Sequence, residues 1–390
     1  MRVINRLTTA AVASVAVSAI IAAAAVAAPS ARAQDAAPAG GHGTITTISS
    51  TVPSNGDVNP YGVAVVRHGQ GKLGRGNILV SNFNNAANQQ GTGTTIVSIT
   101  PSGKRSVFAQ ISASHLPGAC PGGIGLTTAL SILNGGWVVV GSLPTNMGNP
   151  STSKAGCLLV LNSWGKVVET FSGHGINGPW DMTAVNFGKV AELFVTNVLN
   201  GTVAAAIAAG IDTTTTPGPT VFRGTVLRLV VTTPSCGCGV PRLLATDVIG
   251  SGFGQHTDPA ALVIGPTGVG LGRDGTLYVA DTVGNRITAI PNALFRRGSA
   301  GTGRTVTSGR FLNGPLGLAI SPCGNILTVN SGDGYLVVTT PRGHQVARVQ
   351  LDSSGSPPGA GALFGLAVAP GGRGIYFVDD ATNTLNLLSR

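Results

Sequence analysis

The chain has 390 residues, of which only 10% are charged, and it contains 58 glycines and 23 prolines. So few charged residues leave too few strong helix formers on the surface, which excludes a mainly helical protein. The many Gly, Val and Thr residues instead favour an all-β chain of short strands joined by turns. The net charge of +10 is compatible with anionic partners, and its plainest interpretation is that it keeps the protein in solution.

The first 33 residues have the pattern of a secretory signal. Arg2 and Arg6 are followed by an apolar, Ala-rich stretch over residues 7–28, of a type common in bacteria, and by the small-x-small sequence at residues 31–33. The alternative is an uncleaved membrane anchor, because the stretch is nearly long enough to span. We favour cleavage, since the cleavage pattern follows the apolar stretch directly.

These patterns predict a signal peptide at residues 1–33, a short flexible segment at 34–43 and one folded domain at 44–390. We expect the mature protein to be exported, periplasmic or extracellular, monomeric, and without a membrane span. Export makes nucleic acid an unexpected partner, and favours a protein or a cell-envelope polymer. The arginines between residues 296 and 310 could contact such an acidic polymer through an exposed loop.

Six segments of the chain share one internal pattern. Each begins with Pro or Gly and a small residue, continues as an apolar strand, turns at Gly, and ends a second apolar strand on a polar residue. The segments are residues 59–82, 122–142, 178–197, 265–290, 314–330 and 362–379. Each continues into a third strand and most into a fourth, as at residues 94–100 and 105–111. Repeated four-stranded units of this kind are the blades of a β-propeller.

The two ends of the chain indicate that the ring closes. The last unit has only three predicted strands, and a spare strand at residues 44–52 precedes the first unit. Pairing this strand with the last unit completes a sixth blade and removes two open sheet edges. We therefore predict an all-β, six-bladed β-propeller whose last blade is closed by the N-terminal strand.

Residues 265–290, with the sequence GPTGVGLGRDGTLYVADTVGNRITAI, resemble the NHL repeat. The resemblance extends from about Thr44 to the end of the chain, with blades 1 to 3 diverged and interrupted by insertions. It implies a six-bladed propeller. It implies no single activity, because NHL-like propellers include protein-binding, RNA-binding and metal-dependent lyase proteins.

The predicted loops between the second and third strands are long in blades 1, 2 and 3, at residues 83–93, 143–156 and 198–224. These loops share one face, so they predict a built-up rim beside the central opening, where ligands commonly bind. The alternative is neutral insertion into exposed loops. Cys120 and Cys157 could form a disulfide that braces this face, whereas the redox states of Cys236, Cys238 and Cys323 stay open.

Two sets of positions recur in the alignment of the six units. The first set ends the second strand, and its short polar side chains are expected to bond the following backbone and hold the turn. Its members are Asn82, Ser142, Asn197, Asp281, Asn330 and Asp379. The second set begins the innermost strand: Gly62, Gly125, Asp181, Gly268, Gly317 and Gly365.

Asp181 is the one carboxylate in the second set, so we expect it to face the central channel beside Trp180. Three further side chains in nearby loops, His174, His256 and Asp258, are candidates to join it in a ligand site. The alternative role for Asp181 is a bond to the backbone of a neighbouring blade. The candidate ligand-binding residues are therefore Asp181, Trp180, His174, His256 and Asp258.

The resemblance to propeller enzymes implies which side chains a catalytic site would need at the inner positions. Lactonases similar to the gluconolactonase type hold a metal with several carboxylate and amide side chains there, and the NHL-like amidating lyase uses histidines. This chain has one Asp and otherwise Gly. We therefore predict no catalytic residue and no cofactor, and a binding scaffold for a protein or cell-envelope ligand. The alternative is a metal-dependent lyase or lactonase with a divalent cation at Asp181 in the channel.

Overall fold

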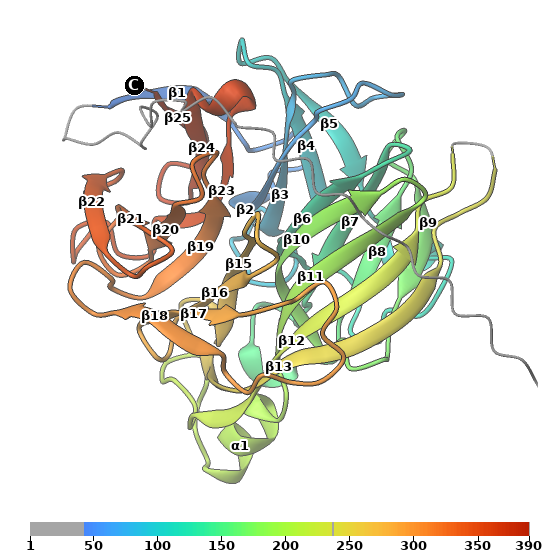
Figure 1. Ribbon diagram of the computed structural model, residues 1–390. Helices are drawn as coiled ribbons and strands as arrows, with labels where there is room; N and C mark the ends of the chain where they lie inside the picture. The colour runs from blue at the N-terminus through green and yellow to red at the C-terminus, as the bar shows by residue number, and fades with distance from the viewer. Residues whose placement is uncertain (1–42, 236–237, 390) are drawn as a thin grey trace, which may run out of the picture. The chain divides into compact units, whose positions relative to one another are not determined.

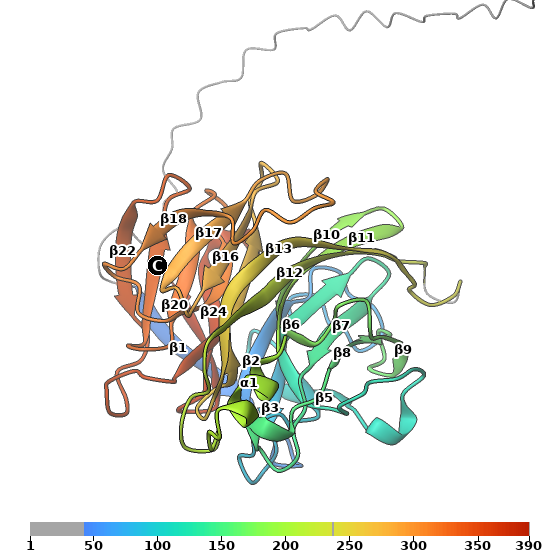
Figure 2. The ribbon, with the colours of Figure 1, turned by 90° about the horizontal axis from the view of Figure 1, so that it is seen from below.

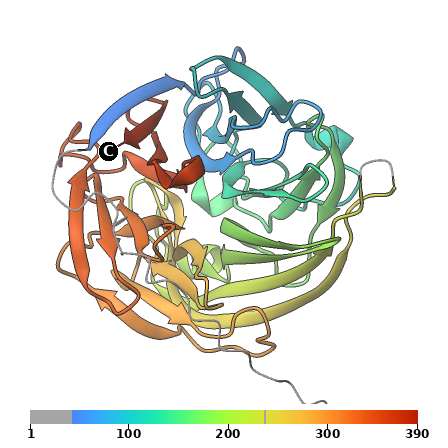
Figure 3. The same ribbon diagram turned by 45° about the horizontal axis from the view of Figure 1, so that its top comes forward.

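The structure, a computed structural model, describes residues 43–235 and 238–389. These residues form six antiparallel sheets arranged in a ring (Figures 1 and 3). The predicted six-bladed β-propeller is confirmed. The predicted signal peptide and nearly all of the segment that follows it lie outside the described residues. None of the described helices is long and apolar enough to span a bilayer.

Blades 1, 2, 4 and 5 each have four strands in chain order. Blade 1 consists of β2 Val58–Val65, β3 Ile78–Asn84, β4 Thr95–Ile99 and β5 Arg105–Gln110, and blade 2 of β6 Leu126–Leu133, β7 Trp137–Ser142, β8 Cys157–Leu161 and β9 Val167–Phe171. Blade 4 consists of β15 Pro266–Leu271, β16 Leu277–Asp281, β17 Arg286–Ile290 and β18 Arg304–Ser308. Blade 5 consists of β19 Pro315–Ile320, β20 Ile326–Asn330, β21 Tyr335–Thr339 and β22 Gln345–Gln350.

Blade 3 has a fifth strand, because the link to blade 4 folds back on the long outer strand. It consists of β10 Gly178–Phe187, β11 Val190–Val198, β12 Val221–Thr232, β13 Leu243–Asp258 and β14 Leu262–Ile264. Strands β12 and β13 run side by side over most of their length (Figure 2). The described helices are short: α1 Thr202–Ala208 and the 3-10 turns Ala113–His115, Pro150–Thr152 and Pro370–Gly372.

The N-terminal strand closes the ring as predicted. Strand β1, Thr44–Ser50, pairs antiparallel with β25, Thr384–Ser389, and completes the blade that β23, Leu363–Val368, and β24, Gly374–Asp379, begin. Figure 3 shows the blue β1 beside the red C-terminal strands. The outer edge strand β1 is mostly exposed, whereas β3, β4, β7 and β8 are buried at every position. Apolar runs buried on both sides are expected for strands packed between neighbouring blades.

Glycines near the start of the innermost strands let neighbouring blades approach closely. A Cβ atom added to Gly317 would lie 1.9 Å from the Phe364 carbonyl oxygen, and one added to Gly365 would lie 2.0 Å from that of Tyr61. The prediction was wrong in blade 2, where Gly125 precedes β6 and Thr128 lies inside the strand against the channel. Blade 2 differs because its inner strand has one more residue in the bulge that opposes β7.

Replacing Gly317 by Ala should lower the free energy of unfolding by about 1–3 kcal/mol, because the added methyl group overlaps the neighbouring strand's backbone. Chemical denaturation measures the change. Gly298→Ala is the matched control, since an added Cβ atom there meets no atom within 4 Å. A loss for Gly317→Ala no larger than that for the control would contradict the close approach.

The polar residues that end the second strands are buried, and their role is structural as predicted, but their partners differ. Asp281 and Asp379 accept hydrogen bonds from the backbone N–H groups of Gly284 and Thr382 in the following turn. In the other blades these residues bond the segment that enters the inner strand: Asn82 to the carbonyl of Thr51, Ser142 to Gly123, Asn197 to Gly175 and Asn330 to Phe311. These four residues therefore fasten a blade's second strand to the start of that blade.

The predicted disulfide joins Cys120 and Cys157, with their Cα atoms 5.3 Å apart. It ties the link between blades 1 and 2 to the start of β8, on the face that carries the three long loops. Cys236 lies outside the described residues, so the redox states of Cys236 and Cys238 stay open.

Removing this disulfide with the double variant Cys120→Ala/Cys157→Ala should cost about 3–4 kcal/mol of unfolding free energy. The bond closes a loop of 37 residues, and the lost restriction of the unfolded chain is of this order. The measurement is urea denaturation of the variant beside the oxidised and the dithiothreitol-treated protein. A loss under 1 kcal/mol would show that the bond contributes little.

Candidate ligand-binding channel

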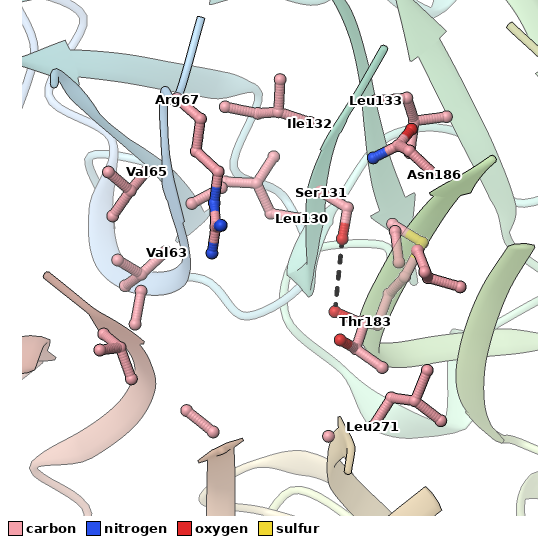
Figure 4. A pocket seen from close by; sticks show the side chains of 18 of the residues that line it. Val63, Val65, Arg67, Leu130, Ser131, Ile132, Leu133, Thr183, Asn186 and Leu271 are labelled. Atoms are coloured by element: carbon pink, nitrogen blue, oxygen red, sulfur yellow. Dashed lines mark hydrogen bonds between the residues drawn. The ribbon is translucent and has the colours of Figure 1, made fainter. Parts of the chain in front are cut away.

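A cavity of about 780 Å³ lies along the axis of the ring. All six innermost strands line it: β2, β6, β10, β15, β19 and β23. Aliphatic side chains line part of its wall, among them Val63, Val65, Leu130, Ile132 and Leu271 labelled in Figure 4, but more of the lining surface is polar than apolar. The aliphatic part arises because alternate residues of each inner strand turn toward the axis and these strands are rich in Val, Leu and Ile.

The cavity opens on the face that carries the turns between the first and second strands. Arg67, His68 and Gln70 of blade 1, Asn134 of blade 2 and Asn186 of blade 3 line this mouth. In Figure 4 the Arg67 side chain extends from the end of β2 into the cavity. Charged and amide side chains therefore surround the mouth, and aliphatic side chains lie deeper together with smaller polar ones.

Stacked aromatic side chains close the other end of the channel. Tyr61 stacks on Phe364 with ring centroids 3.9 Å apart, on Phe83 at 4.4 Å and on Trp180 at 5.9 Å. All four are at most 4% exposed, and we call them the aromatic plug. The plug occupies the axis on the side of the long loops, so the opening expected beside the rim is filled and the channel opens on the opposite face.

Asp181 lies at the blind end of the cavity, in β10, as predicted. Its carboxylate oxygens accept hydrogen bonds from the backbone N–H groups of Met182, at 2.7 Å, and of Val269 in blade 4, at 3.2 Å. Burial raises the pKa of Asp181 to about 8, and the two backbone donors offset part of that shift. Asp181 therefore does both things that were expected as alternatives: it lines the channel, and it bonds the backbone of a neighbouring blade.

The structure does not bring the other candidate residues to Asp181. The Trp180 indole is part of the plug and donates to the Val263 carbonyl at 2.9 Å. His174 is exposed in a tight turn, and His256 is half-buried with Nδ1 3.0 Å from the Thr257 carbonyl. Asp258 accepts from the N–H groups of Ala260 and Ala261 and holds a turn. Of the five, Asp181 alone lines the cavity.

Sequence reasoning missed the other polar residues of the channel. Thr128, Ser131 and Thr183 line its inner part, and Ser131 donates to the Met182 carbonyl at 3.5 Å (Figure 4). Arg67 was also missed, although it directly follows the last apolar residue of the first inner strand. A partial signal was available, because a polar residue within an apolar inner strand faces either the axis or a neighbouring blade, as Thr127 does by donating to the Pro179 carbonyl.

The channel residues do not fit a divalent cation held by several carboxylates or histidines. Both oxygens of Asp181 already accept backbone hydrogen bonds. Within the described ranges, no three His, Cys, Asp or Glu side chains come close enough together to hold a metal ion. Cation sites need several oxygen or imidazole ligands that converge.

The three long loops bond to one another and form a continuous rim. The Thr145 N–H of the blade 2 loop donates to the Gly91 carbonyl of the blade 1 loop at 3.0 Å. Ser151 of blade 2 and Thr213 of blade 3 share a hydrogen bond of 2.7 Å between their hydroxyl oxygens. The insertions are therefore ordered parts of the fold.

The fold and the channel define a six-bladed β-propeller with a central cavity lined by both polar and aliphatic groups. No protein-family model matches the sequence, and no curated protein matches it. Solved structures do match by fold. A gluconolactonase from Xanthomonas campestris is 13% identical with a TM-score of 0.51, over 89% of each chain.

Two further structures extend the comparison. A luciferin-regenerating enzyme is 10% identical with a TM-score of 0.50, over 90% of this chain and 96% of that one. The calcium-binding protein regucalcin from Agrobacterium tumefaciens is 12% identical with a TM-score of 0.49, over 88% and 93%. At these identities the similarity shows the fold and no shared activity.

Proposed function

We propose that this protein is an exported, non-catalytic binding propeller that takes a small molecule with an apolar body and polar groups into its central channel. The single observation that carries the proposal is the axial cavity, which is lined by both aliphatic and polar groups, open at one end and ending at Asp181. Ligand sites are typically apolar concave pockets with a few placed polar groups that fix orientation. A protonated Asp181 carboxyl supplies such a group at the blind end.

The chemistry of the channel defines the class of ligand. Aliphatic side chains from all six blades favour an apolar body. The Asp181 carboxyl, with its pKa raised to about 8 by burial, is neutral at pH 7 and can donate one hydrogen bond. A carbonyl or hydroxyl group at one end of the ligand is therefore its natural partner. Arg67 at the mouth disfavours the entry of cations.

The neutral fluorescent probe N-phenyl-1-naphthylamine tests this proposal. We expect the protein to bind it with one-to-one stoichiometry, and Ala184→Trp or Ala319→Trp to weaken binding at least tenfold by filling the channel. Both alanines line the cavity. Ala87→Trp is the control, because Ala87 is exposed on the rim. Loss of binding in the rim variant alone would place the ligand on the rim and overturn the proposal.

A hydrolase or lyase that acts through Asp181 is the second candidate function. A carboxyl with its pKa near 8 can act as a general acid or base near neutral pH. The solved gluconolactonase with this fold suggests lactones as first substrates. Lactone hydrolysis that is abolished in Asp181→Asn would establish this function, and equal background rates for both proteins would remove it.

Export is tested separately. When the full chain is expressed in a secreting bacterial host, the N-terminal residue of the exported protein should be Gln34. A cell-bound protein that retains residues 1–33 would instead show that this segment is an anchor.

A further inference from the structure

We propose that the face of the propeller around the channel mouth docks on an anionic lipid surface. This mouth face consists of the turns between the first and second strands and between the third and fourth strands of the blades. The inference goes beyond the proposed function, because it rests on surface charge and exposed aromatic rings and does not depend on what the cavity holds.

Basic side chains surround the mouth. Each blade places at least one on a turn of this face: Arg67, Lys166, Lys189, Arg273, Arg342 and Arg373. All six are exposed. Within the described ranges no ion pair joins any of them to an acidic side chain. Asp274 is the acidic residue on the described turns of this face, and it bonds Thr276 in its own turn.

Acidic residues gather on the opposite face, which carries the rim and the links between blades. Asp212, Asp333, Asp352 and Asp380 lie in its loops, Asp258 ends strand β13, and Asp57 is buried there. Three exposed cations, Lys154, Arg223 and Arg310, lie there with them. The positive charge of the protein is therefore concentrated on the mouth face, and such separation orients a protein on a charged surface.

Exposed aromatic rings lie on the same turns as the basic residues. Trp164, between β8 and β9, is 61% exposed; Phe187, the last residue of β10, is 51% exposed; and Phe295, between β17 and β18, is 83% exposed. Exposed rings interspersed with Lys and Arg are typical of surfaces that insert into the headgroup region of a bilayer.

Lipid fits this face better than a soluble polyanion. A polyanion would need the basic residues alone, and the three rings would then remain exposed to water without a partner. An anionic bilayer satisfies both sets, because each Lys or Arg near the surface adds attraction and each inserted ring removes apolar area from water.

Binding to large unilamellar vesicles tests the proposal, with phosphatidylcholine alone and with 30% phosphatidylglycerol. Lys166→Glu/Lys189→Glu/Arg273→Glu removes three basic residues of the mouth face. Lys154→Glu/Arg223→Glu/Arg310→Glu makes the same charge change on the opposite face. We expect the wild type to co-sediment with the anionic vesicles only, the mouth variant to bind roughly a hundredfold more weakly, and the control to bind within a few-fold of the wild type.

Tryptophan fluorescence gives a second readout that needs no charge variant. The chain has three Trp residues, and Trp137 and Trp180 are each only 3% exposed. A blue shift on binding should therefore come from Trp164 and disappear in Trp164→Phe. No vesicle binding by the wild type, or equal loss in both charge variants, would overturn the proposal. So would binding of single-stranded nucleic acid or dextran sulfate with the same variant sensitivity when vesicles are not bound.

Discussion

Replacing Trp180 by Ala should lower the free energy of unfolding by about 3–5 kcal/mol. The indole is 3% exposed, stacks on Tyr61 and Phe364, and donates a hydrogen bond to the Val263 carbonyl. The variant loses all of these contacts and leaves a void where strands of different blades meet. Chemical denaturation at pH 7 measures the loss, which should also appear as a lower melting temperature.

Trp164→Ala is the matched control, because this Trp is 61% exposed on a turn and should change stability by no more than about 0.5 kcal/mol. A Trp180→Ala variant as stable as this control would mean that the plug does not hold the blades together. The channel could then open on the rim face as well.

Replacing Asp181 by Asn should remove a large pH-dependent loss of stability. Burial raises the pKa of Asp181 from 3.8 to about 8 in the folded protein. Between these values the unfolded chain is ionised and the native protein keeps its proton, so the native state binds more protons and stability falls as pH rises. The loss is on the order of 5 kcal/mol across this window, and it is complete above about pH 8.

The measurement is urea denaturation of wild type and Asp181→Asn at intervals from pH 5 to pH 9. The difference in unfolding free energy between the two proteins isolates the contribution of Asp181. Other acids with a raised pKa also lower the stability as pH rises, and their effect is the same in both proteins. Burial, with Asp352 nearby, raises the pKa of Asp379 to about 6, and burial beside Asp379 raises that of Asp380 to about 7. Parallel stability curves for the two proteins would contradict a protonated Asp181.

The fold could be predicted from the sequence because its signals are repeated. Six copies of one strand-turn-strand pattern define the blades, and the spare strand at the N-terminus matched the missing strand of the last blade. The fifth strand of blade 3 escaped prediction because β14 has only three residues. So short a strand gives no periodic pattern.

The site was predicted less well, because the face on which the channel opens depends on side-chain packing between blades. Tyr61 and Phe364 directly precede inner-strand glycines, and their side chains meet only when blades 6 and 1 are neighbours. Sequence reasoning found Asp181 from its place in the repeat, but it placed the opening on the rim face. The position of Thr128 was missed for a related reason, since one extra residue in the blade 2 bulge shifts the alignment.

A crystal structure with 6-bromo-2-naphthol tests the central claim most directly, because bromine is located by its anomalous scattering. The ligand has an apolar body and one hydroxyl group, which is the chemistry that the channel favours. We predict anomalous density inside the cavity lined by the six inner strands, with the hydroxyl oxygen within hydrogen-bond distance of the Asp181 carboxyl. Density confined to the rim, or an empty cavity at a saturating concentration, would contradict the account.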